Sequence, residues 1–266
     1  MLKKLIPFLF IAVLVSGCSM NGQDLSKFSH FIYGLKTDNS ACLGTFWLVE
    51  WRDSVYLVTA GHVVNGWNSV HDTPDPVPET MMLRFRTKTG TYLFLKMATT
   101  DIQRTAVHQP FYRYPDIYIA RISLPEEVIP EAVNIFKDID YSKIDPTVAY
   151  LYGFPPRPGI SFQDMLQWSP VGSVGTPLAN IHAPVHLSAV DMYDSVNMYF
   201  KMDQAASGGF SGSPLFLKDR EGDPYFGGVC MGGDDSAHIA FVVRPDYIRN
   251  AIRQNAATIR YLPLKK

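Results

Sequence analysis

The sequence predicts an all-β protein built from two antiparallel domains, with one helix near the C-terminus. Short apolar or alternating segments, most of five to seven residues, recur along the chain and are rich in Val, Ile, Tyr and Phe. Gly, Pro, Asp or Asn bound most of these segments, which is typical of antiparallel sandwiches and barrels. Strands and helices do not alternate regularly, which argues against a doubly wound parallel sheet.

The expected strands lie on both sides of a polar stretch at about residues 138–146. Those before it are 44–50, 54–59, 81–86, 91–97 and 116–122, and those after it are 148–152, 197–202, 225–231 and 239–243. One helix is expected at 245–253, where apolar side chains at i, i+1, i+4 and i+5 share one face. We therefore expect an N-terminal domain over residues 30–138 and a C-terminal domain over residues 139–266.

The composition indicates a large buried core and excludes several classes of protein. Of the 266 residues, 47% are hydrophobic and 13% aromatic, and only 18% are charged, below the ~25% of an average globular chain. Such a chain buries enough apolar surface to exclude disorder as its main state. A net charge of −1 gives no electrostatic footprint for nucleic acid, so we expect no nucleic-acid partner. Three cysteines are too few for a disulfide scaffold.

Residues 1–17 have the features of a secretory signal peptide. Two lysines precede an apolar run at 5–15, which as a helix would extend only ~16 Å, against a hydrocarbon core of ~30 Å. A short apolar run behind a basic start suits a signal peptide better than a membrane helix.

Residues 14–18 (LVSGC) resemble a bacterial lipobox. The resemblance implies cleavage before Cys18, attachment of acyl chains such as palmitate to that cysteine, and a tether at residues 18–29 that leads from the membrane to the fold. Ser19 resembles the pattern for outer-membrane delivery in Gram-negative lipoproteins, so we expect a protein of the bacterial envelope that faces the periplasm. The alternative is an ordinary secretory signal in which Cys18 has no special role.

Three segments near strand ends form one ordered pattern. His62 ends TAGH (59–62), Asp116 lies in YPDIYIA (114–120), and Ser211 lies in GGFSGSP (208–214). In residue type, in order and in their gaps of 54 and 95 residues, the segments resemble the His, Asp and Ser motifs of trypsin-like serine peptidases. The resemblance covers roughly residues 30–255. It implies two antiparallel six-stranded β-barrels and a C-terminal helix, with His62 and Asp116 in the first barrel and Ser211 in the second.

The resemblance also assigns roles to these residues. Ser211 would attack a peptide carbonyl, His62 would take its proton as general base, and Asp116 would hold the imidazole in the required tautomer, as in the trypsin-like triad. The backbone N–H groups of Gly209 and Ser211 would form the oxyanion hole. We therefore expect a serine endopeptidase that acts on a peptide or protein through an acyl-enzyme intermediate, without a cofactor or metal.

Substrate-binding residues are expected beside this site. By the same match, Cys230, Met231 and Gly232 would offer main-chain hydrogen bonds to an extended peptide. Ala205 stands where members that cleave after basic residues carry Asp, which favours a small or apolar P1 side chain. A histidine in the second barrel would instead favour an acidic P1 side chain, and the available ones are His182, His186 and His238.

Two features leave alternatives open. Phe210 stands before the nucleophile, where digestive members carry an Asp that pairs with a newly freed N-terminus. Phe cannot form that pair, so a catalytically silent lipoprotein that binds peptides or proteins is one alternative, and an esterase or transacylase with the same triad is another. Cys42 and Cys230 could form a disulfide only if the fold brings their Cα atoms within ~7 Å, and free thiols are equally compatible with the sequence.

Overall fold

The computed structural model describes residues 24–35, 41–65, 67–68, 73–74, 78–99, 116–136, 144–156, 164, 166–177, 197–204, 208–219, 223–256 and 259–266. The expected signal peptide at 1–17, Cys18, Ala205, His182 and His186 lie outside these residues. Within the described ranges, no helix has both the length and the apolar character needed to cross a membrane.

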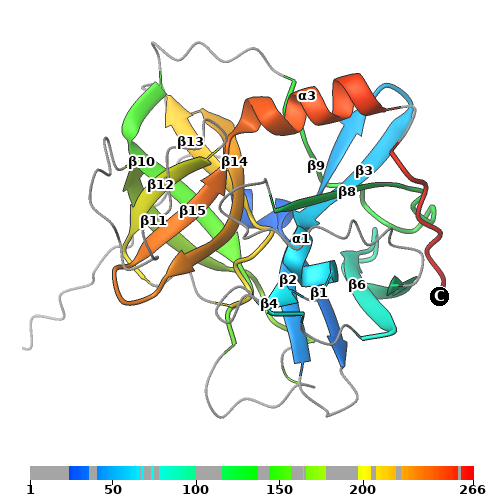
Figure 1. Ribbon diagram of the computed structural model, residues 1–266. Helices are drawn as coiled ribbons and strands as arrows, with labels where there is room; N and C mark the ends of the chain where they lie inside the picture. The colour runs from blue at the N-terminus through cyan, green and yellow to red at the C-terminus, as the bar shows by residue number, and fades with distance from the viewer. Residues whose placement is uncertain are drawn as a thin grey trace, which may run out of the picture.

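The first half of the chain forms one curled sheet, shown in blue to green in Figure 1. Its strands are β1 (His30–Leu35), β2 (Ala41–Trp51), β3 (Ser54–Ala60), β6 (Thr80–Arg86), β7 (Tyr92–Ala98), β8 (Ile117–Ile122) and β9 (Ala132–Val133). They lie in the order β7-β6-β1-β2-β3-β8, with all of these neighbours antiparallel, and β9 pairs in parallel with β2. Smaller elements are the 3-10 helix η1 (Leu25–Phe28), α1 (Gly61–Asn65), and the paired strands β4 (Trp67–Asn68) and β5 (Thr73–Pro74).

The second half forms a closed barrel of antiparallel strands. These are β10 (Ile144–Gly153), β11 (Val171–Pro177), β12 (Asn197–Met202), β13 (Pro214–Asp219), β14 (Pro224–Asp234) and β15 (Ile239–Val243). They close in the order β10-β11-β12-β15-β14-β13. Helix α3 (Pro245–Asn255) follows β15 and runs across the top of the molecule in Figure 1.

Strand β2 shows how the two halves share a core. Its successive side chains alternate between faces, as strand geometry requires, so Phe46 and Leu48 pack inside the first sheet. Trp47 and Val49 belong instead to a cluster that includes barrel and α3 residues, and the Trp47 ring lies 4.7 Å from that of Phe226, centroid to centroid. Because both faces of β2 are buried, its sequence is a nearly continuous apolar run, and each such side chain contributes about 1.5–3 kcal/mol of burial free energy.

The C-terminal tail returns from α3 to the first sheet. Lys265 exchanges two backbone hydrogen bonds with Lys96 of β7, of 2.6 and 3.0 Å. Leu262, which is fully buried, donates its N–H to the carbonyl of Arg121 in β8 at 2.8 Å. The tail, red in Figure 1, therefore pairs with both outer strands of the curled sheet.

The predicted all-β fold of two antiparallel barrels with a C-terminal helix is confirmed: the second half is a closed barrel, and the first half is a curled half-barrel sheet. The two outer strands of its main path pair with the C-terminal tail and not with each other. Strands β1, β11 and β13, and the two-residue strands β4, β5 and β9, were absent from the prediction. β11 (VGSVGTP) contains two glycines and a proline, which lower its strand propensity, and its pairing with β10 and β12 overrides that preference.

Candidate active site

His62 and Asp116 are joined at the ends of two neighbouring strands, β3 and β8. The chain leaves β3 at Ala60 and turns into α1, so that His62 is the second residue of this short helix. The backbone N–H of His62 donates to Asp116 Oδ1 at 2.8 Å, and its ring Nδ1–H donates to Asp116 Oδ2. The N–H of Gly61 also donates to the Asp116 carbonyl, at 2.9 Å. Asp116 thus fixes both the turn at Gly61 and His62 and the orientation of the His62 ring. Because Nδ1 is bonded to Asp116, Nε2 is the ring nitrogen that can accept a proton.

This pairing determines the basicity of His62. Burial alone lowers the pKa of His62 because it penalises the imidazolium, but the charge of Asp116 and its hydrogen bond outweigh burial. The pKa of His62 is therefore raised above its ordinary value of 6.5. The side chains are 22% (His62) and 11% (Asp116) exposed, so solvent still reaches the imidazole. The arrangement provides an oriented imidazole with increased proton affinity.

Ser211 lies in a tight loop, residues 208–213, that leads into β13. Gly209 and Gly212 both have a φ of +91°, in the region that favours glycine. A Cβ at Gly209 would overlap the carbonyl of Phe154, and a Cβ at Gly212 would overlap the carbonyl of Thr45. The two glycines therefore allow the loop to lie directly against the backbone of both halves.

Among the described residues, the backbone carbonyl groups of residues 209–211 all accept hydrogen bonds, whereas their N–H groups have no acceptor. The Gly209 carbonyl accepts from Thr45 Oγ1 at 2.7 Å and from the N–H of Phe154 at 3.1 Å. The next two carbonyls accept from the N–H groups of Ser213 and Thr45, each at 2.9 Å. None of the three N–H groups donates to any residue in the described part of the chain. Consecutive free N–H groups of this kind form a nest that can hold an anion.

The hydroxyl of Ser211 donates to the carbonyl of Met231 at 3.3 Å, and among the described residues no hydrogen bond joins it to His62. The two motifs nevertheless meet at one place. A Cβ at Gly44 would lie 2.8 Å from the side chain of Val63, the residue after His62, and 3.2 Å from the Ser211 carbonyl. The candidate nucleophile and base therefore lie at the same junction between the two halves.

Comparison with solved structures identifies this architecture. Anisep, a protease from Arthrobacter nicotinovorans, matches with a TM-score of 0.56 and 13% identity over 87% of this chain and 96% of its own. The fold is that of the trypsin-like serine peptidases. GrC, a granzyme, matches this trypsin-like fold with a TM-score of 0.55 and 15% identity over 88% of this chain and 95% of its own. HL collagenase has a TM-score of 0.55 and 11% identity over 88% of this chain and 94% of its own. No protein-family model and no curated protein matches the sequence.

Phe210 anchors the loop that carries Ser211, in this trypsin-like fold, by apolar packing. Its side chain is only 1% exposed and belongs to a cluster in the second barrel with Leu151 and Leu215. A Cβ at Gly153 would lie 2.6 Å from Cδ1 of Phe210, so the ring rests on the Gly153 backbone. The residue thus fills apolar space, and its role differs from that of the ion-pairing Asp in digestive members.

The expected substrate-binding residues on β14 differ in how accessible they are to a peptide. Cys230 is fully buried, its N–H donates to Ser213 at 2.9 Å, and its carbonyl accepts from the N–H of Gly212 at 2.7 Å. A register shift in the pairing with β15 follows, between Cys230 and Gly232. A Cβ at Gly232 would meet no described atom within 4 Å. Of the three predicted residues, Met231 and Gly232 therefore stay the better candidates for pairing with a peptide.

The two described cysteines are free thiols. Cys42 Sγ donates to the carbonyl of Val63 at 3.3 Å. Burial raises the pKa of Cys230 to about 12, against the smaller opposing effect of a hydrogen bond to the Gly232 carbonyl. Among the residues described, no group of three or more His, Cys, Asp or Glu is placed to hold a metal ion.

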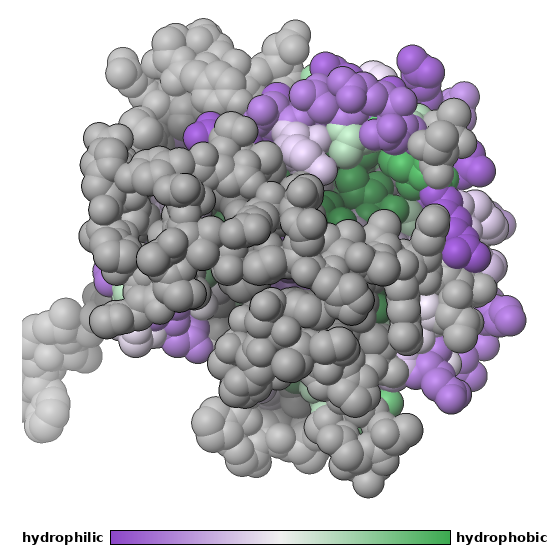
Figure 2. Space-filling model, viewed as in Figure 1, coloured by the Kyte–Doolittle hydropathy of each residue, from purple (hydrophilic) through white to green (hydrophobic). Residues whose placement is uncertain are grey.

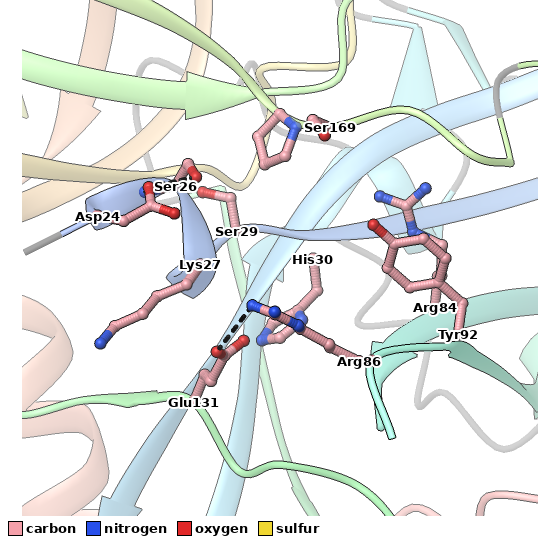
Figure 3. Close-up of a pocket in the computed structure, with 12 residues that line it drawn as sticks. Asp24, Ser26, Lys27, Ser29, His30, Arg84, Arg86, Tyr92, Glu131 and Ser169 are labelled. Carbon is pink, nitrogen blue, oxygen red and sulfur yellow. Dashed lines mark hydrogen bonds and ion pairs between the residues drawn. The ribbon is translucent and has the colours of Figure 1, made fainter. Parts of the chain in front are cut away.

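A separate cavity of about 280 Å³ lies beside η1, β1 and β6 (Figure 3). None of His62, Asp116 and Ser211 lines it, and its charged side chains include Arg86 and Glu131, which form an ion pair with a separation of 3.9 Å. His30 also lines the cavity but is only 4% exposed. Burial, more than the nearby charge of Arg84, lowers the pKa of His30 to about 4, although a hydrogen bond to the Glu131 backbone opposes this shift. His30 is therefore neutral near pH 7.

Proposed function

We propose that this protein is a serine endopeptidase that uses His62, Asp116 and Ser211. The observation that carries the proposal is the two-point attachment of His62 to Asp116, next to a loop with three N–H groups that have no partner among the described residues. An oriented imidazole and a backbone nest at one junction supply the base and the oxyanion donors that acyl transfer needs. The trypsin-like fold is consistent with this chemistry and supports a hydrolase.

The reaction begins when the Ser211 hydroxyl turns from the Met231 carbonyl to Nε2 of His62. His62 takes the hydroxyl proton while Ser211 Oγ bonds to the substrate carbonyl carbon, and the electron pair of the carbonyl moves to its oxygen. The N–H groups of Gly209 and Ser211 hold the resulting oxyanion. His62 then gives the proton to the leaving amine, which produces the acyl-enzyme. A water molecule attacks this ester, its proton passes to His62 and back to Ser211, and the acid product is released.

The substrate in this proposal is an extended peptide that lies along β14. When Ser211 turns toward His62, the Met231 carbonyl loses its hydrogen bond and can accept one from a peptide N–H. Open space above Gly232 leaves room for the peptide beside this strand. The identity of Ala205 favours a small or apolar P1 side chain.

The proposed location is the bacterial envelope, with the fold tethered through lipid on Cys18. The lipobox resemblance of residues 14–18 supports this part of the proposal. Cells that express the full chain and are fed alkyne-palmitate should yield labelled protein in the membrane fraction. Cys18→Ser should abolish both the label and the membrane association. Unlabelled wild-type protein in the soluble fraction would contradict the tether.

Activity is tested with the purified mature chain and a library of quenched fluorescent peptides that vary at P1. Cleavage should be found with small or apolar P1 residues and should disappear in Ser211→Ala. Ser173→Ala is the matched control, because Ser173 is also a buried serine of the second barrel but bonds Asp203, away from the junction. Cleavage that survives in Ser211→Ala would contradict the proposed nucleophile.

The second candidate is a catalytically silent protein that binds peptides with the same fold. The Ser211 hydroxyl on the Met231 carbonyl and the absence of an ion-pairing residue at Phe210 favour it. This candidate predicts peptide binding of equal affinity in wild type and Ser211→Ala, with no cleavage of any library member. Calorimetry with library peptides on both proteins distinguishes the two functions.

A further inference from the structure

Thr45 of β2 makes three hydrogen bonds at the junction between the two halves. It is fully buried, and its N–H donates to the Ser211 carbonyl at 2.9 Å while its Oγ1 donates to the Gly209 carbonyl at 2.7 Å. Its own carbonyl accepts from Thr59 Oγ1 at 2.7 Å. Thr45 lies 164 residues before Gly209 in the sequence, so tertiary structure alone creates this contact.

The side-chain bond is the informative one, because the backbone bonds of Thr45 could be made by any residue. The Gly209 carbonyl already accepts from the N–H of Phe154 at 3.1 Å, so it would still have a partner without Thr45. The hydroxyl therefore adds little by merely satisfying a buried acceptor. The bond from the Thr45 hydroxyl, as the second bond to this carbonyl, instead fixes the direction of the Gly209 carbonyl. It thereby also fixes the plane of the peptide that joins Gly209 to Phe210.

Thr45 holds, through their carbonyls, both residues whose N–H groups are proposed to bind the oxyanion. The fixed carbonyls of Gly209 and Ser211 lie in the peptide planes that also carry the N–H groups of Phe210 and Gly212. Among the described residues, the N–H groups of Gly209 and Ser211 themselves have no partner. The loop also rests on Thr45 directly, since a Cβ at Gly212 would overlap the Thr45 carbonyl and Thr59 Oγ1. Thr59 lies three positions before the general base, so Thr45 connects the strand that carries the base to the loop that carries the nucleophile.

We infer that the Thr45 hydroxyl is a positioning residue that orients the oxyanion loop for reaction. This inference rests on the proposed function and concerns the same site. It predicts that loss of the hydroxyl lowers the rate of the chemical step and leaves binding before that step largely unchanged. A small displacement of the groups that stabilise the transition state typically costs up to about 100-fold in rate.

The test compares Thr45→Val, which exchanges the hydroxyl for a methyl group, with Thr45→Ser, which keeps it. Thr99→Val is the matched control, because Thr99 is 3% exposed and its Oγ1 also donates to a buried carbonyl, that of Pro78, at 2.7 Å. The readouts are the maximal rate and the half-saturation concentration for labelling of Ser211 by a fluorophosphonate. In Thr45→Val the maximal rate should fall about 10- to 100-fold with a half-saturation concentration within threefold of wild type. Thr45→Ser and Thr99→Val should label within threefold of the wild-type rate.

A second readout does not depend on activity. The N–H groups of Gly212 and Ser213 are bonded in the loop, so their hydrogen exchange reports whether the loop holds its shape. Exchange in residues 208–213 should accelerate in Thr45→Val and stay at the wild-type rate in Thr99→Val. If Thr45→Val does not fold, Thr45→Ala removes the same hydroxyl without an added methyl group.

Equal labelling and equal exchange in Thr45→Val and Thr99→Val would overturn the inference. A wild-type protein that does not label at all would instead overturn the proposed function. In that case the exchange comparison alone decides whether Thr45 holds the loop.

Discussion

Replacing Phe210 by alanine removes a ring that is 1% exposed and packs in the second barrel. Such Phe-to-Ala exchanges in protein cores cost about 3–5 kcal/mol, with the larger values where the surroundings cannot collapse into the cavity. The ring rests on the backbone of Gly153, and the strands around it belong to a closed barrel, so little collapse is available. We therefore expect a loss of about 4 kcal/mol in the free energy of unfolding, which for a chain of this size lowers Tm by about 8–16 °C.

Phe200→Ala is the matched control for this prediction. Phe200 is 2% exposed and belongs to the same cluster, but it lies on β12, outside the nucleophile loop. Urea unfolding should give similar losses for both variants. Under conditions in which both are folded, only Phe210→Ala should slow the labelling of Ser211 by a fluorophosphonate, by about tenfold or more. The reasoning is refuted if Phe210→Ala loses less than about 1 kcal/mol, or if it labels as fast as Phe200→Ala.

Three further predictions follow from the ionisable groups. Asp116→Asn should lower the labelling rate about 10⁴-fold, the loss that this exchange causes in trypsin-like enzymes. The midpoint of the pH–rate profile should also shift downward, because Asp116 raises the pKa of His62 against the effect of burial. An unchanged midpoint would contradict the role of Asp116 in raising that pKa. The pKa of His30 is lowered from 6.5 to about 4, mainly by burial, so the unfolded chain takes up this proton first and stability should fall as pH drops from 6.5 to 4. The loss approaches about 3 kcal/mol, and thermal unfolding of His30→Phe should lack this component; equal pH slopes in both proteins would speak against it. Burial raises the pKa of Cys230 to about 12, so iodoacetamide at pH 8 should modify this thiol only after the chain unfolds. Peptide mass spectrometry measures the modification. Modification of Cys230 in the folded chain would contradict this prediction.

The candidate site residues could be selected from the sequence because each lies in a short segment beside a strand. The meeting of His62 and Asp116 follows from the pairing of β3 with β8, and apolar segments on both sides of each motif already indicated those strands. Helix α3 was predicted for a similar reason, since its buried face repeats with helical spacing, and Ile248 and Ile252 are fully buried. Local sequence patterns were sufficient to predict these strands and helix α3, because residues close together in the sequence determine them.

Contacts between distant segments could not be predicted in this way. Thr45 stands in an apolar strand, and nothing near it in the sequence indicates a bond to Gly209. The return of the tail to the first sheet has the same cause, because backbone pairing between Lys265 and Lys96 leaves no residue pattern. Phe210 was recognised as a departure from the trypsin-like pattern, but its packing on Gly153 depends on the closed barrel.

The central claim is that Ser211 is a nucleophile activated by His62. The most direct measurement is treatment of the purified mature chain with a fluorophosphonate, followed by mass spectrometry of its peptides. The account predicts one phosphonyl group on Ser211 in the wild type, none in Ser211→Ala, and labelling slowed by orders of magnitude in His62→Ala. It is contradicted if the folded wild type stays unlabelled across pH 6–9, or if His62→Ala labels at the wild-type rate.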